Sequence, residues 1–223
     1  MQEPNRSILS ALPLDKQMTV IFDLANGRCK LENLPNGSLS IDWGTRKEWW
    51  HKGVWRRTDF FNAEGKCHSE DGPAVIYADG TRIWFQNGQK HRVDGPAIEH
   101  PDGHMEWWRE GQLHRDHLPA VIWGAGCEKW YQRGQLHREN GPAIVIPGQH
   151  REWYCHGQRH RSDGPAVEQS NGFRLWYRHG KLHRADGPAI EHPDGRMEWW
   201  LEGQQLDRNA FLARTIGKRA PKP

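Results

Sequence analysis

Two rows of basic side chains return at a fixed spacing, and they are the residues in this sequence best able to carry chemistry. A histidine comes back every 23 residues, at His68, His91, His114, His137, His160 and His183. The row of arginines that follows consists of Arg92, Arg115, Arg138, Arg161 and Arg184, with Ser69 in the first place. Cationic groups at regular intervals can bind phosphates or an acidic partner.

The same two rows also have a structural interpretation. Each arginine can pair with the aspartate of the following Asp-Gly or stack on an aromatic ring, and each histidine can bond a turn backbone. The regularity of the spacing, equal to that of the turn glycines, favours this interpretation. If each hairpin adds two strands about 4.8 Å apart, histidines of neighbouring copies lie roughly 10 Å apart. That is too far to share a metal ion, so we expect no metal site and no cofactor.

Both rows belong to a 23-residue repeat that must position them. Pro-Ala returns six times, at Pro73, Pro96, Pro119, Pro142, Pro165 and Pro188. A β-branched aliphatic residue follows each alanine, and a second aromatic and a glycine stand 12 and 15 residues after each proline. The residue 11 places after the proline is always tryptophan, and we expect this row to form the core of the repeat: Trp84, Trp107, Trp130, Trp153, Trp176 and Trp199.

Each repeat reads as a β-hairpin followed by a second turn. Asp-Gly or Asn-Gly near the middle predicts a hairpin with a type I′ turn, which needs positive φ at both central residues. The tryptophan and its aromatic neighbour suit the return strand, where successive side chains point to opposite faces. We expect the tryptophan to share a face with the aliphatic residue, and the second aromatic to lie above the small alanine. The sequence therefore predicts an all-β fold, an elongated single-layer sheet or solenoid of about seven stacked hairpins.

Segments outside the strict repeat divide the rest of the chain. The expected parts are an N-terminal cap at 1–36, a degenerate first repeat with an inserted loop at 37–66, six repeats at 67–203, and a C-terminal cap with a basic tail at 204–223. In the N-terminal cap we expect a hairpin with strands at 19–24 and 29–34, preceded by a helical turn at 7–12. A short capping helix is expected after Asp207 or Asn209.

Composition narrows the functional classes. The chain has 223 residues and a net charge of +3, far from the basicity of a dedicated nucleic-acid binder. No apolar run is long enough for a membrane-spanning helix, and no signal peptide is evident. The four cysteines form no CxxC pair, which favours free thiols in a cytoplasmic protein. No nucleophile elbow, phosphate loop or HExxH motif is present, so we expect the protein not to be an enzyme.

The hairpins and their Gly-x-x-His-Arg-x-Asp-Gly-Pro-Ala connections, over residues 37–203, resemble MORN repeats. They are most similar to the variant repeats of bacterial, phage and large-virus proteins, including antitoxin-like ones. The resemblance implies a scaffold or interaction module in the cytoplasm of a bacterium or a phage-infected host cell. In its concrete form it implies an inhibitor that occludes a bacterial target or defence protein.

Positions that differ between copies are the candidates for partner recognition. They stand 3, 4, 9 and 13 residues after each proline, and either drift on a solvated face or a binding surface explains their variation. Because Trp, Tyr and Arg dominate binding hot spots, we expect a protein partner to contact Tyr77, Arg109 and Trp123. The inserted loop adds Trp55, Arg56 and Arg57, which either fold back or project as a contact loop. The alternative function is binding of nucleic acid or a phosphorylated ligand through the arginine row and aromatic stacking. The oligomeric state is left open.

Overall fold

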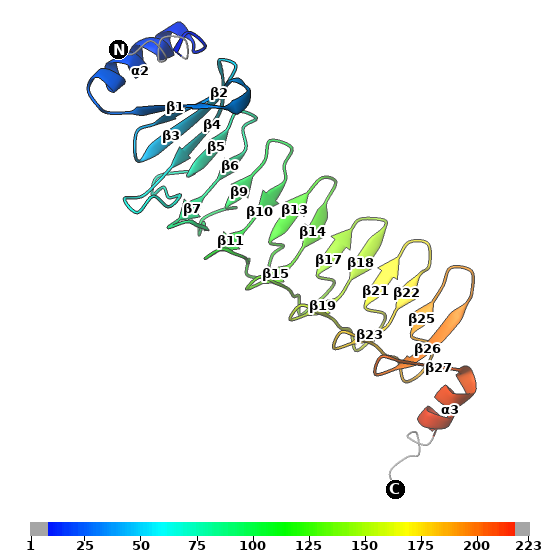
Figure 1. Ribbon diagram of the computed structural model, residues 1–223. Coiled ribbons are helices and arrows are strands. Elements are labelled where there is room, and N and C mark those ends of the chain that lie inside the picture. The colour runs from blue at the N-terminus through cyan, green and yellow to red at the C-terminus, as the bar shows by residue number, and fades with distance from the viewer. Residues whose placement is uncertain (1–8, 217–223) are drawn as a thin grey trace. The chain divides into compact units, whose positions relative to one another are not determined.

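A computed structural model describes residues 9–216, the side chains of Asn36 and Ile216 excepted. The predicted basic tail at 217–223 and residues 7–8 of the predicted helical turn lie outside the described residues. The chain forms antiparallel hairpins, one after another, with α2 (Leu14–Ala25) before them and α3 (Arg208–Ile216) after them (Figure 1). The prediction of an all-β stack of hairpins with a short C-terminal helix is confirmed.

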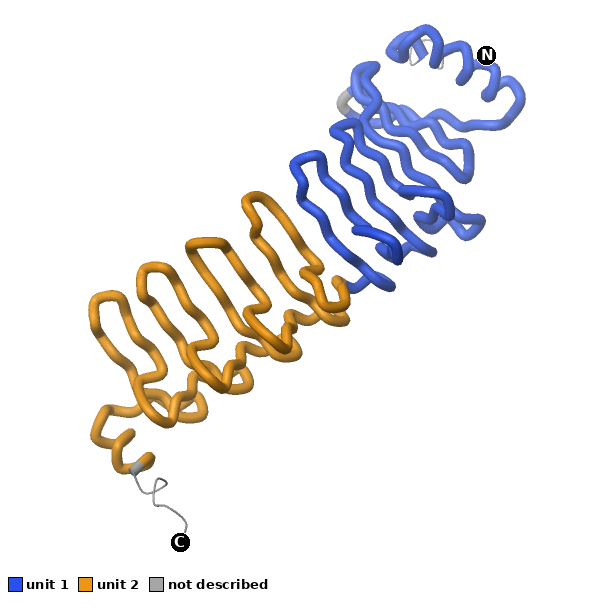
Figure 2. Tube along the Cα trace, turned by 180° about the vertical axis from the view of Figure 1, so that it is seen from behind, with its two compact units in different colours: residues 1–112 blue, residues 113–223 orange. Residues whose placement is uncertain are grey.

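The chain divides into two compact units, residues 1–112 and 113–223 (Figure 2). Strands of the first unit pair in chain order as an antiparallel meander. They are β1 (Lys30–Leu34), β2 (Ser38–Asp42), β3 (Arg46–His51), β4 (Val54–Phe60), β5 (Val75–Tyr77), β6 (Arg82–Ile83), β9 (Ile98–Glu99) and β10 (Met105–Glu106). A single-turn 3₁₀ helix, Pro35–Gly37, joins β1 to β2.

The second unit is an antiparallel meander of the same kind. Its strands are β13 (Val121–Trp123), β14 (Cys127–Lys129), β17 (Ile144–Ile146), β18 (His150–Glu152), β21 (Val167–Gln169), β22 (Arg174–Leu175), β25 (Ile190–Glu191), β26 (Met197–Leu201) and β27 (Gln204–Leu206).

Each regular copy also carries a small second hairpin after its tryptophan. These hairpins pair strands of two residues each: β7 (Phe85–Gln86) with β8 (Gln89–Lys90), β11 (Trp108–Arg109) with β12 (Gln112–Leu113), β15 (Tyr131–Gln132) with β16 (Gln135–Leu136), β19 (Tyr154–Cys155) with β20 (Gln158–Arg159), and β23 (Tyr177–Arg178) with β24 (Lys181–Leu182). Main-chain bonds join successive small hairpins within a unit: the N–H of Gly157, for example, donates to the carbonyl of Leu136 at 2.9 Å. Each repeat thus contributes a main hairpin and a small one.

The two turns of a copy differ from the predicted assignment. At the main turn only the glycine has positive φ, +92° at Gly80, and Oδ1 of Asp79 accepts the N–H of Thr81 at 2.8 Å. This is a three-residue loop with a bulge, not a type I′ turn. Both central residues have positive φ at the second turn, where Glu110 and Gly111 show +49° and +75°. The type I′ geometry therefore belongs to the small hairpin.

The register between copies reverses the predicted faces of the aromatic pair. Arg82 lies opposite Glu99, and in the same register the N–H of Trp84 donates to the carbonyl of Ala97 in the next copy at 2.8 Å. Cross-strand partners share a face, so the tryptophan lies on the side of the alanine and the β-branched residue points the other way. All six repeat alanines are fully buried. A side chain no larger than a methyl group leaves room for the indole beside it.

The N-terminal cap contains a helix where the sequence predicted a strand at 19–24. Val20 is fully buried, and Ile21 and Leu24 pack against the same cluster, which is a helical spacing. The cluster closes over the first strands and consists of Leu9, Leu12, Val20, Cys29, Leu39 and Ile41. Local β propensity in Thr-Val-Ile-Phe was misleading because tertiary packing selects the helix. The predicted return strand is present as β1, which pairs with β2.

The predicted loop at 54–66 is largely a strand. β4 (Val54–Phe60) lies between β3 and β5 and pairs with both. Only residues 61–66 form a turn, in which Oδ1 of Asn62 accepts the N–H groups of Glu64 and Lys66 at 3.0 Å each. The insertion therefore adds a strand to the sheet and projects little.

The C-terminal helix begins as predicted after Asp207, whose Oδ1 accepts the N–H of Ala210 at 2.8 Å. Phe211 of α3 is 3% exposed, and α3 contacts β26 and β27. All four cysteines are free, in agreement with the sequence-based prediction. Neither α2 nor α3, the helices of the described part of the chain, has the length and apolar character needed to cross a membrane.

The buried alanine row makes a direct prediction about stability. Ala166→Leu should lower the free energy of unfolding by about 1–3 kcal/mol, because added methylene groups overpack a site with no free space. Urea denaturation measures the change. Ala185→Leu, on an exposed connection of the same copy, is the matched control and should have little effect. Equal losses in the two variants would contradict the packing role of the alanine.

Candidate functional site

The row arginines lie over the row tryptophans. The guanidinium carbon of Arg161 is 3.9 Å from the centre of the Trp153 ring. Three further pairs have distances between 3.7 and 4.0 Å: Arg92 over Trp84, Arg138 over Trp130, and Arg184 over Trp176. Each contact is a cation–π interaction within one copy. The arginine covers the face of the indole that the single-layer sheet leaves open.

Hydrogen bonds hold the same guanidinium groups in place. Nε of Arg161 donates to Asp163 at 2.9 Å, and Nη1 donates to the carbonyl of Pro165 at 3.1 Å and to Glu168 at 3.0 Å. Arg92 and Arg184 make the same three contacts with the residues at the equivalent repeat positions. Arginine is thus bound to the aspartate and stacked on an aromatic, as the structural interpretation of the row expects. Phosphate binding by the row stays a prediction.

Two copies replace the aspartate of this arrangement. His117 and Asn140 stand where the other copies have Asp, and there Arg115 and Arg138 donate to the carbonyls of the following prolines at 3.2 and 3.1 Å. Burial lowers the pKa of both guanidinium groups; the charge of Glu128 partly opposes this for Arg138. Arg138 still lies 3.7 Å from the centre of the Trp130 ring, so this copy retains the cover of its indole without the aspartate.

The row histidines bond turn backbones. Nδ1 of His160 accepts the N–H of His179 at 3.2 Å, at the second turn of the next copy. All six make this contact: His68 with Asn87, His91 with Glu110, His114 with Arg133, His137 with His156, His160 with His179, and His183 with Glu202. An Nδ1 acceptor requires the tautomer with its proton on Nε2. The histidines thus tie each type I′ turn to the preceding copy.

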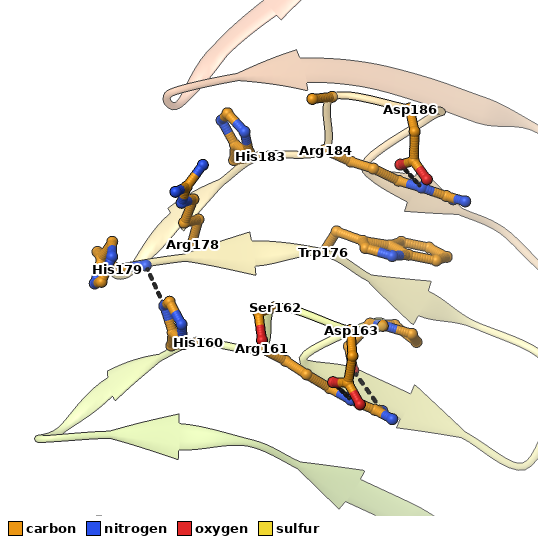
Figure 3. Close-up of a pocket in the computed structure, with 13 residues that line it drawn as sticks. His160, Arg161, Ser162, Asp163, Trp176, Arg178, His179, His183, Arg184 and Asp186 are labelled. Carbon is orange, nitrogen blue, oxygen red and sulfur yellow. Dashed lines mark hydrogen bonds and ion pairs between the residues drawn. The ribbon is translucent and has the colours of Figure 1, made fainter.

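Open hollows recur between successive connections of the second unit. One, of about 990 Å³, is lined by two His-Arg-x-Asp connections and by the strand between them (Figure 3). Figure 3 shows Trp176 between the Arg161–Asp163 and Arg184–Asp186 pairs, with His160 and His179 at the other end. A similar hollow of about 670 Å³ lies one copy earlier. Their polar groups repeat from copy to copy, an arrangement suited to binding.

One charged network departs from this uniformity. Glu152 is 8% exposed and accepts hydrogen bonds from Arg159 at 2.7 Å and from Tyr154 at 2.8 Å; its Oε1 lies 2.6 Å from Nε2 of His150. Burial raises the pKa of Glu152, but these hydrogen bonds outweigh it and lower the pKa. Burial and the bond to Glu152 raise the pKa of Tyr154 to about 12. Both carboxylate oxygens of Glu152 are therefore bound to neighbouring side chains.

The structure brings two of the predicted partner-binding residues together in the first unit. Arg57 lies opposite Tyr77, its guanidinium carbon 5.7 Å from the tyrosine ring and 4.9 Å from that of Trp49. Its Nη2 is 2.9 Å from Asp59. Arg56 is exposed, whereas Trp55 is half-buried and donates to Thr58 at 3.0 Å. The sequence left open whether this segment folds back or projects as a contact loop. Arg57 and Trp55 follow the first alternative, because both bond residues of the sheet.

The remaining two predicted residues lie on separate strands. Trp123 is half-buried on β13, with the ammonium of Lys129 4.7 Å from its ring centre. Arg109 is exposed on β11. The six predicted residues are thus distributed over four strands, β4, β5, β11 and β13, of which β13 belongs to the second unit.

Sequence reasoning missed two features. Leu14, Met18 and Phe22 form an exposed apolar stripe on α2, with exposed fractions of 79%, 68% and 59%. The stripe was missed because residues 19–24 were assigned to a strand and no helix was expected before them. A cluster of His137, Cys155 and His156 was missed because the row histidines were compared only with one another. The signal was present, since Cys155 and His156 stand beside the turn that His137 contacts.

Comparison with known proteins adds no family. No protein-family model matches the sequence, and no curated protein matches it significantly. The interpretation therefore rests on the residues and their geometry.

Replacing one row arginine tests the stack. Arg161→Lys should lower the free energy of unfolding by about 1–2 kcal/mol, because lysine keeps the charge but loses the planar stack and the forked hydrogen bonds. Chemical denaturation gives the value. Arg178→Lys, on an exposed strand of the next copy, should change little. An unaffected Arg161→Lys variant would show that the stack contributes no stability.

The histidine row predicts acid sensitivity. Burial, with the neighbouring histidine as a lesser cause, lowers the pKa of His137 and His160 below the ordinary value of about 6.5. The unfolded chain then binds more protons below that pH, so stability should fall as the pH drops from about 7.5 toward 5. Thermal unfolding across this range measures the loss. In His160→Asn, whose amide oxygen can accept the same N–H without titrating, the loss should be smaller; an identical profile would refute the assignment.

Proposed function

We propose that the protein is a non-catalytic repeat module that binds a protein partner. The observation that carries this proposal is the contrast between constant and variable positions of the repeat. The repeat alanines are fully buried, and the row arginines and histidines bond their own sheet. None of the residues 3, 4, 9 or 13 places after the prolines is buried. The scaffold is therefore uniform, while its accessible side chains differ from copy to copy.

The accessible residues of the third and fourth copies are the most apolar. Trp123 and Ile146 occupy the fourth place after their prolines, where the fifth copy has Gln169 and the sixth has His192. Ile122 and Val145 stand beside them in the third place, where the fifth and sixth copies carry glutamate. A half-buried tryptophan beside aliphatic residues is the composition of a protein-binding hot spot. It supports Trp123 as an anchor residue.

Charge supports a protein partner over nucleic acid. The row arginines are bound to carboxylate and carbonyl groups of the chain itself, and the net charge of the whole chain is +3. Phosphate binding would require these guanidinium groups to exchange their carboxylate and carbonyl partners for a ligand. The finer form of the function, an inhibitor that occludes a bacterial target or defence protein, is a proposal supported by the resemblance to antitoxin-like repeats alone.

Affinity capture with matched variants tests the proposal. The intact protein is immobilised and exposed to bacterial lysate at moderate and high salt, with and without nuclease. We expect a stoichiometric protein that survives both treatments and is lost from Trp123→Ala. Gln169→Ala, the same repeat position two copies later, is the control and should retain the partner.

Other outcomes would overturn the proposal. Recovery of nucleic acid, or loss of all bound material at high salt, would favour phosphate contacts by the arginine row, because such contacts weaken steeply with salt. Capture of no macromolecule would exclude a stable protein partner in that lysate. Capture unchanged by Trp123→Ala would remove Trp123 as the anchor while leaving the binding function in place.

A further inference from the structure

Three metal-binding side chains meet in the fourth regular copy. One ligand atom from each of His137, Cys155 and His156 lies within 4.8 Å of the other two. The two imidazole rings are stacked, with centroids 4.4 Å apart and planes inclined by 21°. In a tetrahedral site with bonds of about 2.0–2.3 Å, ligand atoms are about 3.3–3.8 Å apart. Rotations of exposed His156 and half-buried Cys155, moving their ligand atoms by about 1 Å, therefore suffice to close the site.

The histidine of the row already has the protonation state that a metal requires. Nδ1 of His137 accepts the N–H of His156 at 3.2 Å, which leaves the proton on Nε2 and an in-plane lone pair on Nδ1. A cation bound at Nδ1 would replace this single long hydrogen bond.

The surroundings admit a cation. His137 and Cys155 line the hollow of about 670 Å³ that opens beside Trp153 and Tyr154, so an ion and its remaining water ligands have access. The negative charge of Glu139 attracts a positive charge placed at His137. Within the described part of the chain, His137, Cys155 and His156 are the His, Cys, Asp or Glu residues that bring three ligand atoms within 4.8 Å of one another.

The repeat itself supplies an internal comparison. His160 and His179 form the equivalent ring pair one copy later, with centroids 4.3 Å apart. There Arg178 occupies the position of Cys155. Across the six copies this position holds Gln86, Arg109, Gln132, Cys155, Arg178 and Leu201. The fourth copy is thus the one that adds a thiol to a histidine pair.

We propose that His137, Cys155 and His156 bind one divalent transition-metal ion, with Zn²⁺ as the preferred class. A thiolate and two imidazoles are ligands that select zinc-like ions over Mg²⁺ or Ca²⁺. Three protein ligands leave the fourth tetrahedral position open to water or to a group of a bound molecule. Binding releases the thiol proton of Cys155 to solvent. The site is separate from the proposed protein-binding anchor and does not depend on it.

Cobalt(II) is the probe that tests the site in the whole protein. Titration of the reduced protein should give a thiolate-to-cobalt charge-transfer band and the visible bands of tetrahedral Co²⁺, saturating at one ion per chain. Added Zn²⁺ should bleach both sets of bands. Cys155→Arg, which copies the residue found at this place in the next repeat, should fold and lose the bands.

The converse substitution sharpens the test. Arg178→Cys places a thiol beside His160 and His179, and the stoichiometry should rise from one ion to two. His156→Leu should abolish the wild-type bands, whereas His179→Leu should leave them unchanged. Circular dichroism confirms that each variant is folded.

The results that would overturn the proposal are specific. Absence of a thiolate-to-cobalt band in the folded wild type would exclude the site. Bands or stoichiometry unchanged in Cys155→Arg would show adventitious chelation by surface histidines only. Equal losses in His156→Leu and His179→Leu would contradict the assignment of ligands.

Discussion

The fold depends on how a single layer of strands protects an indole ring that it cannot enclose. A sheet without a second layer has no opposite wall, so one face of each row tryptophan would meet water. The guanidinium of the same copy covers that face at about 4 Å and is fixed by an aspartate and a proline carbonyl. On the sheet side the tryptophan shares its face with an alanine of the next copy. Ala, Trp, Arg and Asp thus form one packing unit, and their spacing explains why the repeat tolerates no slippage.

The hairpins were predictable because turn residues act locally. A central glycine, preceded by Asp or Asn in four of the six copies, and the later glycine marked two turns in every copy, and the 23-residue period gave the number of hairpins directly. The turn types were exchanged in the prediction, since Asp79 bonds the backbone through its side chain while Glu110 adopts positive φ. No propensity rule anticipates a glutamate in that conformation. The turn's main-chain bond to row histidine His91 stabilises it from the preceding copy.

Features that depend on tertiary contact could not be predicted. α2 forms because Val20 packs into a cluster with residues of β2 and the segment before the helix, and those partners are not local in sequence. β4 has the irregular composition of a loop, yet both its edges are paired. The convergence of Cys155 with His137 required knowing that a row histidine reaches the second turn of the next copy. The predicted partner-binding residues were chosen by type alone, and the structure distributes them over several strands.

Main-chain hydrogen bonds at constant positions link successive copies, together with bonds from the row histidines and arginines. A glycine N–H meets the carbonyl of the previous copy, and an arginine N–H meets that of the next aromatic residue. These main-chain hydrogen bonds do not depend on which side chains stand at the variable positions. Residues 94–108 and 186–200 are nearly the same sequence, and they lie four periods apart. Recombination between the DNA segments that encode such copies removes or adds whole multiples of 23 codons and leaves every remaining junction intact. The number of repeats in the array can therefore change during evolution without any change in the contacts between neighbouring copies.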